Sequence, residues 1–423
     1  MTNLTLSLTN AASSLFAALR ERTGDGVGIS RDSYGSGETA AVDVFSHFAR
    51  GEGLHTECDA GGNLIVCADP ESASRKSIVI GSHLDSVPQG GNFDGAAGIV
   101  AGLLCLIRFR EERVPPPCPI KVLGLRGEES AWFGKAHIGA NALFGTLSPA
   151  DLLLRKRESS ITLRECMAGV GADVDGIAAS RPLLDPSSVA SYLELHIEQG
   201  AVMVSRGFAT AVVPAIRGNV RHNRIRCVGE AAHSGATPRW LRRDAVFAVA
   251  DLLMRLDEHW RVLLERGLDL VVTAGIISTH PDEHAVSRVP GEATFSLEIR
   301  SQSQDTLEAF HRLIQTECRV VEDARKVKFL FDRRIDSAPA RMNERIVATL
   351  LECSRWLGLP AELVPSGPGH DASLFANNGI PSGMLFVRND GGSHNPRESM
   401  ALEDFMAGVE LLFHACKEPR WLF

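Results

Sequence analysis

The sequence predicts an α/β protein with two domains, the second of which is inserted into the first. Its 423 residues are too many for one ordinary hydrophobic core. Strand-like and helix-like segments alternate from about residue 40, which favours an α/β architecture. Between residues 214 and 332 the order of segments changes, and the first type of alternation resumes after it. We therefore expect domain segments at 1–213, 214–332 and 333–423, with the first and third forming one domain.

The first domain begins with elements that alternate along the chain. In order, we expect a helix at 40–50, strands at 62–68 and 77–83, a helix at 95–112, and strands at 119–130 and 191–200. The last three of these strands each end in polar residues. Because open α/β sheets bind ligands at the carboxyl ends of their strands, the sequence predicts a site at that edge.

The inserted segment has a different order of elements. We expect, in order, a strand at 223–232, a helix at 239–267, strands at 268–278 and 292–301, a helix at 303–321 and a strand at 326–334. This β-α-β-β-α-β order is that of the ferredoxin-like split unit, which is long enough to form a domain of its own.

The composition excludes several classes of protein. The formal net charge of −8 argues against non-specific binding to nucleic acid or to an anionic membrane. The longest apolar run, 96–107, is shorter than the ~20 residues that span a bilayer, and the first basic residue is Arg20, too late for a signal peptide. The nine cysteines are scattered singly, as in proteins with reduced thiols. We expect a cytoplasmic protein with a small-molecule partner.

Four short stretches combine the residue types of a metal site with a strand end or a tight loop. Two divalent ions that share a bridging carboxylate need that bridge and about two further ligands each. These stretches contain that number of ligand-type residues: His83, Asp94, Glu129, His196 and His394. Taken singly, each stretch also allows a structural explanation, as a strand-end histidine, an acidic helix start or a polar turn.

Two further acidic residues lie beside the expected ligands. Asp85 lies two residues from His83, where it is expected to accept the imidazole N–H and to hold the ring in its metal-binding tautomer. Of the adjacent acids Glu128 and Glu129, one can bind metal and the other can take a proton from a metal-bound water. The chain lacks the G-x-S-x-G, G-x-G-x-x-G and P-loop motifs of other enzyme classes.

Six motifs, in this order, resemble those of the hydantoinase/carbamoylase-type amidases. They are "GSHLDSVPQGGNFDGAAGIVAGL", "GEES", "LELHIEQG", "AAHSGATP", "GPGHDA" and "GGSHNPRES", and the resemblance extends from about residue 25 to 415. This branch of the dinuclear zinc aminoacylase/carboxypeptidase superfamily includes N-carbamoyl-L-amino acid hydrolases, β-ureidopropionases and allantoate amidohydrolases. The resemblance implies a zinc-peptidase-like catalytic domain, a mixed sheet flanked by helices, with an inserted ferredoxin-like α+β lid through which two subunits form a homodimer.

The resemblance also implies roles for individual residues. His83 and His196 would each bind one of two zinc-class ions (zinc, with manganese, cobalt or nickel as alternatives), with Asp94 as the bridge. Glu129 and His394 would complete the two ligand sets, and Glu128 would be the general base. The implied substrate contacts are Gln199, His233, Ser287, Arg300 and His370, with Arg300 as a carboxylate clamp and His233 reaching the site of the partner subunit.

The chain departs from the family pattern near the expected substrate. The family usually has Asn-Val-Ile-Pro-Gly where this chain has Ser287, Arg288 and then Val-Pro-Gly. After the acidic pair the family often has Gly, a small residue and Arg, where this chain has Ser130, Ala131 and Trp132. The expected reaction is metal-dependent hydrolysis of an N-carbamoyl-L-amino acid or related ureido acid to amino acid, ammonia and carbon dioxide. The alternatives are an allantoate amidohydrolase, an aminopeptidase, dipeptidase or N-acyl-amino-acid deacylase of the same superfamily, and a non-catalytic binding protein on this scaffold.

Overall fold

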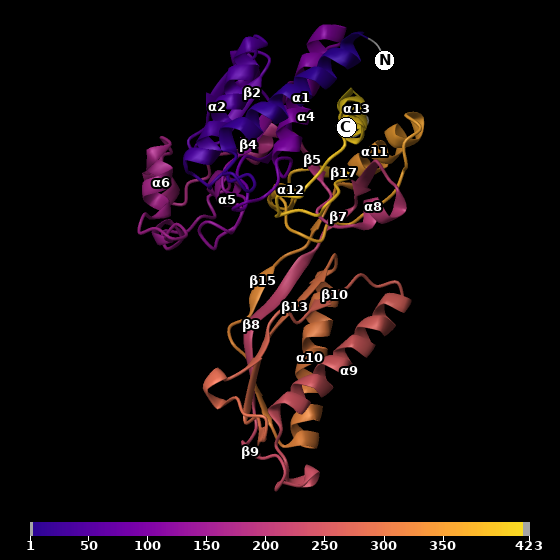
Figure 1. Cartoon of the computed structure of the whole chain (residues 1–423). Coiled ribbons are helices and arrows are strands. Elements are labelled where there is room, and N and C mark those ends of the chain that lie inside the picture. The colour runs from indigo at the N-terminus through magenta and orange to yellow at the C-terminus, as the bar shows by residue number, and fades with distance from the viewer. Residues whose placement is uncertain (1–2, 418–423) are drawn as a thin grey trace. The chain divides into compact units, whose positions relative to one another are not determined.

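The computed structural model describes residues 3–417, whose helices and strands are shown in Figure 1. The chain forms two compact units: unit 1 extends to Pro214 and resumes at Arg341, and unit 2 is Ala215–Ala340. The second boundary lies beyond the expected position at 332. The reason is that strand β15 (Ile335–Ser337) pairs antiparallel with β8 (Gly218–Val228) and therefore belongs to unit 2.

Unit 1 is built on a seven-stranded sheet of mixed direction. Its strand order is β1 (His55–Cys58), β2 (Leu64–Cys67), β4 (Ile120–Leu125), β3 (Ser77–His83), β5 (Val189–Ile197), β17 (Ser382–Val387) and β6 (Thr210–Val213). The central strands β4, β3, β5 and β17 are parallel, whereas β1, β2 and β6 pair antiparallel. This mixed sheet, flanked by helices, confirms the predicted fold class.

Helices flank this sheet and enclose the main core of unit 1. The longer ones are α1 (Asn3–Thr23), α2 (Ser36–Gly51), α4 (Ala96–Glu112), α11 (Glu344–Trp356) and α13 (Leu402–Lys417). Shorter ones are α3 (Pro70–Ser74), α5 (Ile138–Leu143), α6 (Leu163–Gly169), α7 (Val174–Ala178), α8 (Val202–Arg206) and α12 (Asp371–Asn377). Helix α4 packs closely on the sheet, since a side chain at Gly98 would lie 2.5 Å from the carbonyl oxygen of Leu195. The N-terminal helix α1 was not predicted.

Unit 2 is a second sheet covered by two helices. Its strand order is β10 (Val271–Thr273), β13 (Glu292–Ser301), β8 and β14 (Lys328–Leu330), and β11 (Ile277–Thr279) pairs with β13. Helices α9 (Ala245–Glu265) and α10 (Gln304–Arg325) pack against each other and against β8 and β13 (Figure 1). Along β13, buried and half-exposed residues alternate, as expected for a sheet with one covered face.

The expected long helix of unit 2 begins later than its pattern suggested. It starts at Ala245 because the side chain of Asp244 accepts hydrogen bonds from the N–H groups of Val246 and Phe247. The residues before it form a short 3₁₀ turn, η3 (Arg239–Leu241). Short strands complete the chain: β7 (Ala215–Ile216), β9 (Ala232–His233), β12 (Arg288–Val289) and β16 (Ala340–Arg341). None of the described helices has the length and apolar character needed to span a bilayer.

Candidate metal centre

Neighbouring parallel strands bring His83 and His196 together. Strand β3 ends at His83, and β5 pairs with it in a register that places Ile80 opposite Leu193, three residues before each histidine. Asp94 follows in the loop that leads into α4. The next residue must be glycine, because Gly95 has a φ of +69° and a side chain there would lie 2.5 Å from His83 Nδ1.

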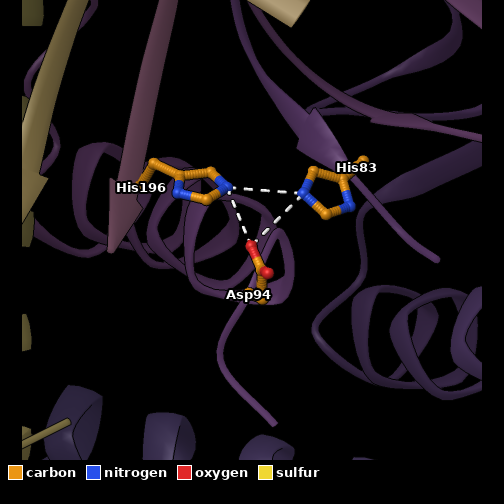
Figure 2. Close-up of side chains that lie close together, drawn as sticks. All are labelled: His83, Asp94 and His196. Atoms are coloured by element: carbon orange, nitrogen blue, oxygen red, sulfur yellow. Dashed lines mark hydrogen bonds and ion pairs between the residues drawn. The ribbon is translucent and has the colours of Figure 1, made fainter. Parts of the chain in front are cut away.

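Figure 2 shows the three side chains converging on one point. The Nε2 atoms of His196 and His83 lie 3.2 Å and 3.5 Å from Asp94 Oδ1, and they lie 3.3 Å from each other. All three residues are almost fully buried. Donor atoms bound to one tetrahedral zinc ion at about 2.0–2.1 Å lie about 3.3 Å apart. The spacing of this triad therefore fits a divalent ion.

The outward hydrogen bonds of the two rings determine which nitrogen faces the centre unprotonated. His83 Nδ1 lies 3.1 Å from the carbonyl oxygen of Asp85, and His196 Nδ1 lies 2.9 Å from that of Ile197. A carbonyl only accepts, so these contacts assign the proton of each neutral ring to Nδ1. In the neutral rings, both Nε2 lone pairs then face each other and the Asp94 carboxylate, an arrangement that a bound cation would satisfy.

The other oxygen of Asp94 belongs to a second group. His394 Nε2 lies 3.3 Å from Asp94 Oδ2 and 3.0 Å from Glu129 Oε1. Glu129 Oε1 is buried, and among the described residues it accepts no hydrogen bond. Within the group of His83, Asp94 and His196, the possible ligand atoms all lie within 4.8 Å of one another, and the same holds within the group of Asp94, Glu129 and His394. Asp94 thus presents one oxygen to each group, as a bridging carboxylate would.

All five expected ligand residues lie together, but they are distributed differently from the expectation. His83 and His196 were expected to serve different ions. The structure places both at the same oxygen of Asp94, and it places Glu129 and His394 at the other. The physical reason is the pairing of β3 with β5, which aligns the two histidines side by side.

Asp85 lies beside His83 and also holds the main chain of the acidic pair. Its Oδ1 atom is within ion-pair distance of His83 Nδ1, at 3.4 Å, and its main-chain oxygen lies nearer to that nitrogen, at 3.1 Å. The two carboxylate oxygens also accept the N–H groups of Glu128, at 3.0 Å, and Glu129, at 3.1 Å. Because β3 and β4 are neighbours in the sheet, Asp85, which follows β3, can hold the main chain of the residues that follow β4. Burial acts to raise the pKa of Asp85, but His83 and the surrounding donors hold it below its usual value.

Glu128 lies beside a histidine that the sequence analysis did not single out. His137 Nδ1 is 3.3 Å from Glu128 Oε1 and 3.2 Å from Asp371 Oδ1. Burial raises the pKa of Glu128 to about 8, although His137 and His83 oppose that shift. A signal was present, since His137 is the only histidine between His83 and His196, but no motif surrounds it.

Two buried charged residues hold the loop that carries Asp94. The guanidinium of Arg31 donates to the carbonyl oxygens of Leu84 and Asp94, each at 2.7 Å. The carboxylate of Glu398 accepts from Asp94 N at 3.2 Å and from Ser393 Oγ at 3.1 Å, so it joins this loop to the segment of His394. Neither residue was among the expected site residues, since Arg31 acts on main-chain carbonyl groups and Glu398 acts on a main-chain N–H and the Ser393 hydroxyl.

Two expected substrate contacts lie at the ligand residues. The Gln199 amide nitrogen is 3.1 Å from Asp94 Oδ2 and 3.1 Å from His394 Nε2. His370 is buried, with its ring centroid 4.4 Å from that of His196 and its Nε2 atom 2.8 Å from Ser366 Oγ. Burial places the pKa of His370 well below the usual value.

The remaining expected contacts belong to unit 2. His233 and Arg288 are paired across β9 and β12, and the neighbouring Ser287 accepts the N–H of Ser234 at 2.8 Å through its carbonyl oxygen, so His233 and Ser287 lie close together. Arg300 lies on β13, where its guanidinium makes two contacts of 3.0 Å to the Glu298 carboxylate. Unit 2 therefore holds two separate polar regions.

Comparisons with known proteins agree over most of the chain. Residues 79–418 match the family described as Peptidase family M20/M25/M40. The chain is 34% identical over 389 residues to the N-carbamoyl-L-amino acid amidohydrolase of Geobacillus stearothermophilus, covering 92% of each. It is 30% identical over 370 residues to the allantoate amidohydrolase of Escherichia coli K12, covering 87% of each. The crystal structure of a hydantoinase/carbamoylase family amidase from Burkholderia ambifaria matches with a TM-score of 0.82 and 26% identity, over 97% of this chain and 96% of that one.

Proposed function

Because the chain belongs to peptidase family M20/M25/M40, within its hydantoinase/carbamoylase-type amidases, we propose that it hydrolyses a C–N bond of an N-carbamoyl-L-amino acid or a related ureido acid. One water is consumed, and the products are the amino acid, ammonia and carbon dioxide. The observation that carries the proposal is the convergence of two imidazole lone pairs on Asp94 in a chain so similar to an enzyme of that name.

The proposed site holds two divalent ions, with zinc as the first choice and manganese, cobalt or nickel as alternatives. His83, Asp94 and His196 would hold one ion, and Asp94, Glu129 and His394 the other. The donor set supports this assignment, since imidazole and carboxylate are the ligands that catalytic zinc uses. Such ions supply Lewis acidity and lower the pKa of a bound water.

Glu128 is the proposed general base. It takes a proton from the attacking water and gives it to the leaving nitrogen. The N–H group of Glu128, held by Asp85, fixes the main chain beneath this side chain. Because Asp85 also holds the N–H of Glu129, one buried carboxylate sets the spacing between the base and a ligand.

His233 is proposed to stabilise the charge that develops on the substrate oxygen. Its Nδ1 accepts the N–H groups of Gly235 and Ala236, each at 3.2 Å. In the neutral ring, the proton then lies on Nε2, where it can be donated to an oxyanion. Arg300 is the proposed clamp for the substrate carboxylate, and Gln199, Ser287 and His370 are the further proposed contacts.

We also propose that the protein is a cytoplasmic homodimer formed through unit 2, with His233 completing the site of the partner. Exposed apolar side chains support this: Trp240 is 82% exposed, Phe247 60% and Met254 68%. The test mixes inactive Glu128→Gln and His233→Ala proteins. Subunit exchange should restore up to about a quarter of wild-type activity, because half of the dimers are mixed and each has one intact site. Activity that stays at background means that His233 serves its own chain.

The substrate class is tested with a panel of carbamoyl, acyl and dipeptide substrates and allantoate, with ammonia detection on metal-loaded protein. Release of ammonia from N-carbamoyl-L-amino acids supports the proposal. The similarity to allantoate amidohydrolases favours allantoate as the second candidate. Cleavage of only acyl or dipeptide substrates contradicts both candidates, and no turnover of any substrate favours a binding protein.

A further inference from the structure

We infer that His137 is a positioning residue for the Glu128 carboxylate, to which it is joined through both its main chain and its side chain, with Asp371 as a brace. The inference rests on the proposed role of Glu128 as general base. It concerns how that base is held in place, and it adds a residue outside every motif identified in the sequence.

The main chain of His137 is attached to that of Glu128. His137 N donates to the carbonyl oxygen of Glu128 at 2.9 Å, and the next two residues continue the ladder: Ile138 N to Gly127 O at 2.7 Å and Gly139 N to Arg126 O at 2.8 Å. His137 itself has a φ of +55°, in the left-handed region that a residue with a side chain rarely adopts. Such conformations persist only where the surroundings impose them, and they concentrate at functional sites.

The side chain of His137 lies between two carboxylates. Its Nδ1 is 3.3 Å from Glu128 Oε1 and 3.2 Å from Asp371 Oδ1, and the Asp371 contact also satisfies hydrogen-bond geometry. Asp371 is buried at the start of α12, and within the described residues its Oδ2 atom has no hydrogen-bond partner. One ring nitrogen therefore lies within reach of two carboxylates, and this environment favours the protonated, positively charged imidazole.

Charge and packing hold the ring in this place. Burial lowers the pKa of His137, but Glu128 and Asp371 outweigh burial and raise it to about 9. On the other side of the ring, Gly369 leaves the space it needs, since a Cβ there would lie 3.1 Å from His137 Nε2. The imidazole is thus fixed between the α12 end and the loop after β4.

The consequence concerns catalysis more than binding. A glutamate carboxylate rotates about three bonds, and small displacements of a catalytic group lower the rate strongly. The side chain of His137 contacts Glu128 and Asp371, and its carbonyl oxygen accepts from Asn141; none of these is an expected metal ligand, so loss of the side chain should leave the ligand residues in place. We therefore expect kcat to fall while KM and metal content stay near wild type.

Two matched variants separate the side chain from the unusual backbone. Glycine and asparagine both tolerate a positive φ, so neither His137→Gly nor His137→Asn adds backbone strain. Asparagine carries an N–H donor at the δ position, as histidine does, whereas glycine carries none. In metal-loaded protein, His137→Gly should lower kcat by about 10-fold or more, and His137→Asn should stay within a few-fold of wild type. Equal losses in the two variants would overturn the inference.

A double-mutant cycle tests whether the effect passes through Glu128. If His137 acts on that carboxylate, His137→Gly should cost little further in the Glu128→Gln background. The same fold-loss in both backgrounds, with two ions bound, overturns the inference and leaves the proposed function intact. Near-normal turnover of Glu128→Gln alone removes the base role, and with it the inference.

Discussion

Each unit contains a pair of buried histidines whose Nε2 atoms lie close together. In unit 1 the distance between His83 and His196 is 3.3 Å, and in unit 2 that between His222 and His311 is 3.1 Å. Distance alone does not distinguish the two pairs. The partners of their outer nitrogens do.

In unit 2 the two rings form an ordinary hydrogen bond. His222 Nδ1 is 3.1 Å from Asp332 Oδ1, so it carries the proton and leaves a lone pair on Nε2. His311 Nδ1 is 3.4 Å from a guanidinium nitrogen of Arg334, a donor, so its own proton lies on Nε2 and is donated to His222. Every nitrogen is satisfied without an added cation.

In unit 1 both outer nitrogens face carbonyl oxygens, and both inner nitrogens are therefore acceptors. Asp94 adds a third acceptor at the same point. The comparison teaches that a histidine pair becomes a candidate metal site through its outward hydrogen bonds, which set the tautomer of each ring.

The largest expected effect separates the two pairs directly. Purified protein should hold about two divalent ions per chain, and a chelator should abolish activity until zinc, manganese, cobalt or nickel is restored. His196→Gln should lose metal and activity, whereas the matched His311→Gln should keep both. Elemental analysis and turnover measure this, and metal loss in His311→Gln would mean that the protons of the two histidine pairs are not placed as assigned.

The next effect tests the base within unit 1. Glu128→Gln keeps size and hydrogen bonding but cannot accept a proton, so kcat should fall by about 100-fold with metal content unchanged. Steady-state kinetics gives kcat, and elemental analysis of the same preparation gives the metal content. Normal turnover would assign the proton transfer to another group.

A smaller effect is expected from unit 2, which we propose to bind substrate and no metal. Arg300→Ala should weaken kcat/KM by about 2 kcal/mol, or roughly 30-fold, since a charge-assisted contact is lost. Esterified substrates should be poor for the wild type and little affected by the substitution. If the variant keeps the wild-type preference for free acids, Arg300 does not clamp the substrate carboxylate, and its contact with Glu298 is structural.

The smallest effect concerns the pH dependence of stability in unit 2. Burial lowers the pKa of His311, and the charges of Arg334 and His222 add to this, against the opposing Glu308 and Asp336. The folded ring therefore takes up a proton less readily than the unfolded one. Its contribution to stability is complete above the unfolded pKa of about 6.5 and is lost as pH falls below it, by at most about 1.4 kcal/mol per pH unit.

His311→Gln provides the comparison, since glutamine donates from the same ε position without titrating. The free energy of unfolding is measured in urea at several pH values between about 5 and 7. Its slope against pH should be smaller for the variant than for the wild type. A steeper slope in the variant would mean that His311 is protonated in the folded state, and the hydrogen bond to His222 would then need a different proton assignment.

The sequence by itself determined the residue types and their local positions. Strand patterns that end in His83, Glu128 and His196 required no knowledge of distant contacts, because period and strand ends are local properties. The order of elements likewise predicted an α/β architecture with an inserted segment, since a change in alternation is visible along the chain, whereas the mixed sheet was implied by the family resemblance.

Only the tertiary structure decided which of these groups share an oxygen of Asp94 and what supports them. His83 and His196 lie together because β3 and β5 are paired neighbours whose register aligns the two strand ends. The local spacing of residues does not specify the order of strands in a sheet. The carboxylate of Asp85 faces the N–H groups of Glu128 and Glu129 for the same reason, across β3 and β4. His137 reaches Asp371 across 234 positions of sequence. Contacts between distant segments depend on how the sheet assembles, which no single segment specifies.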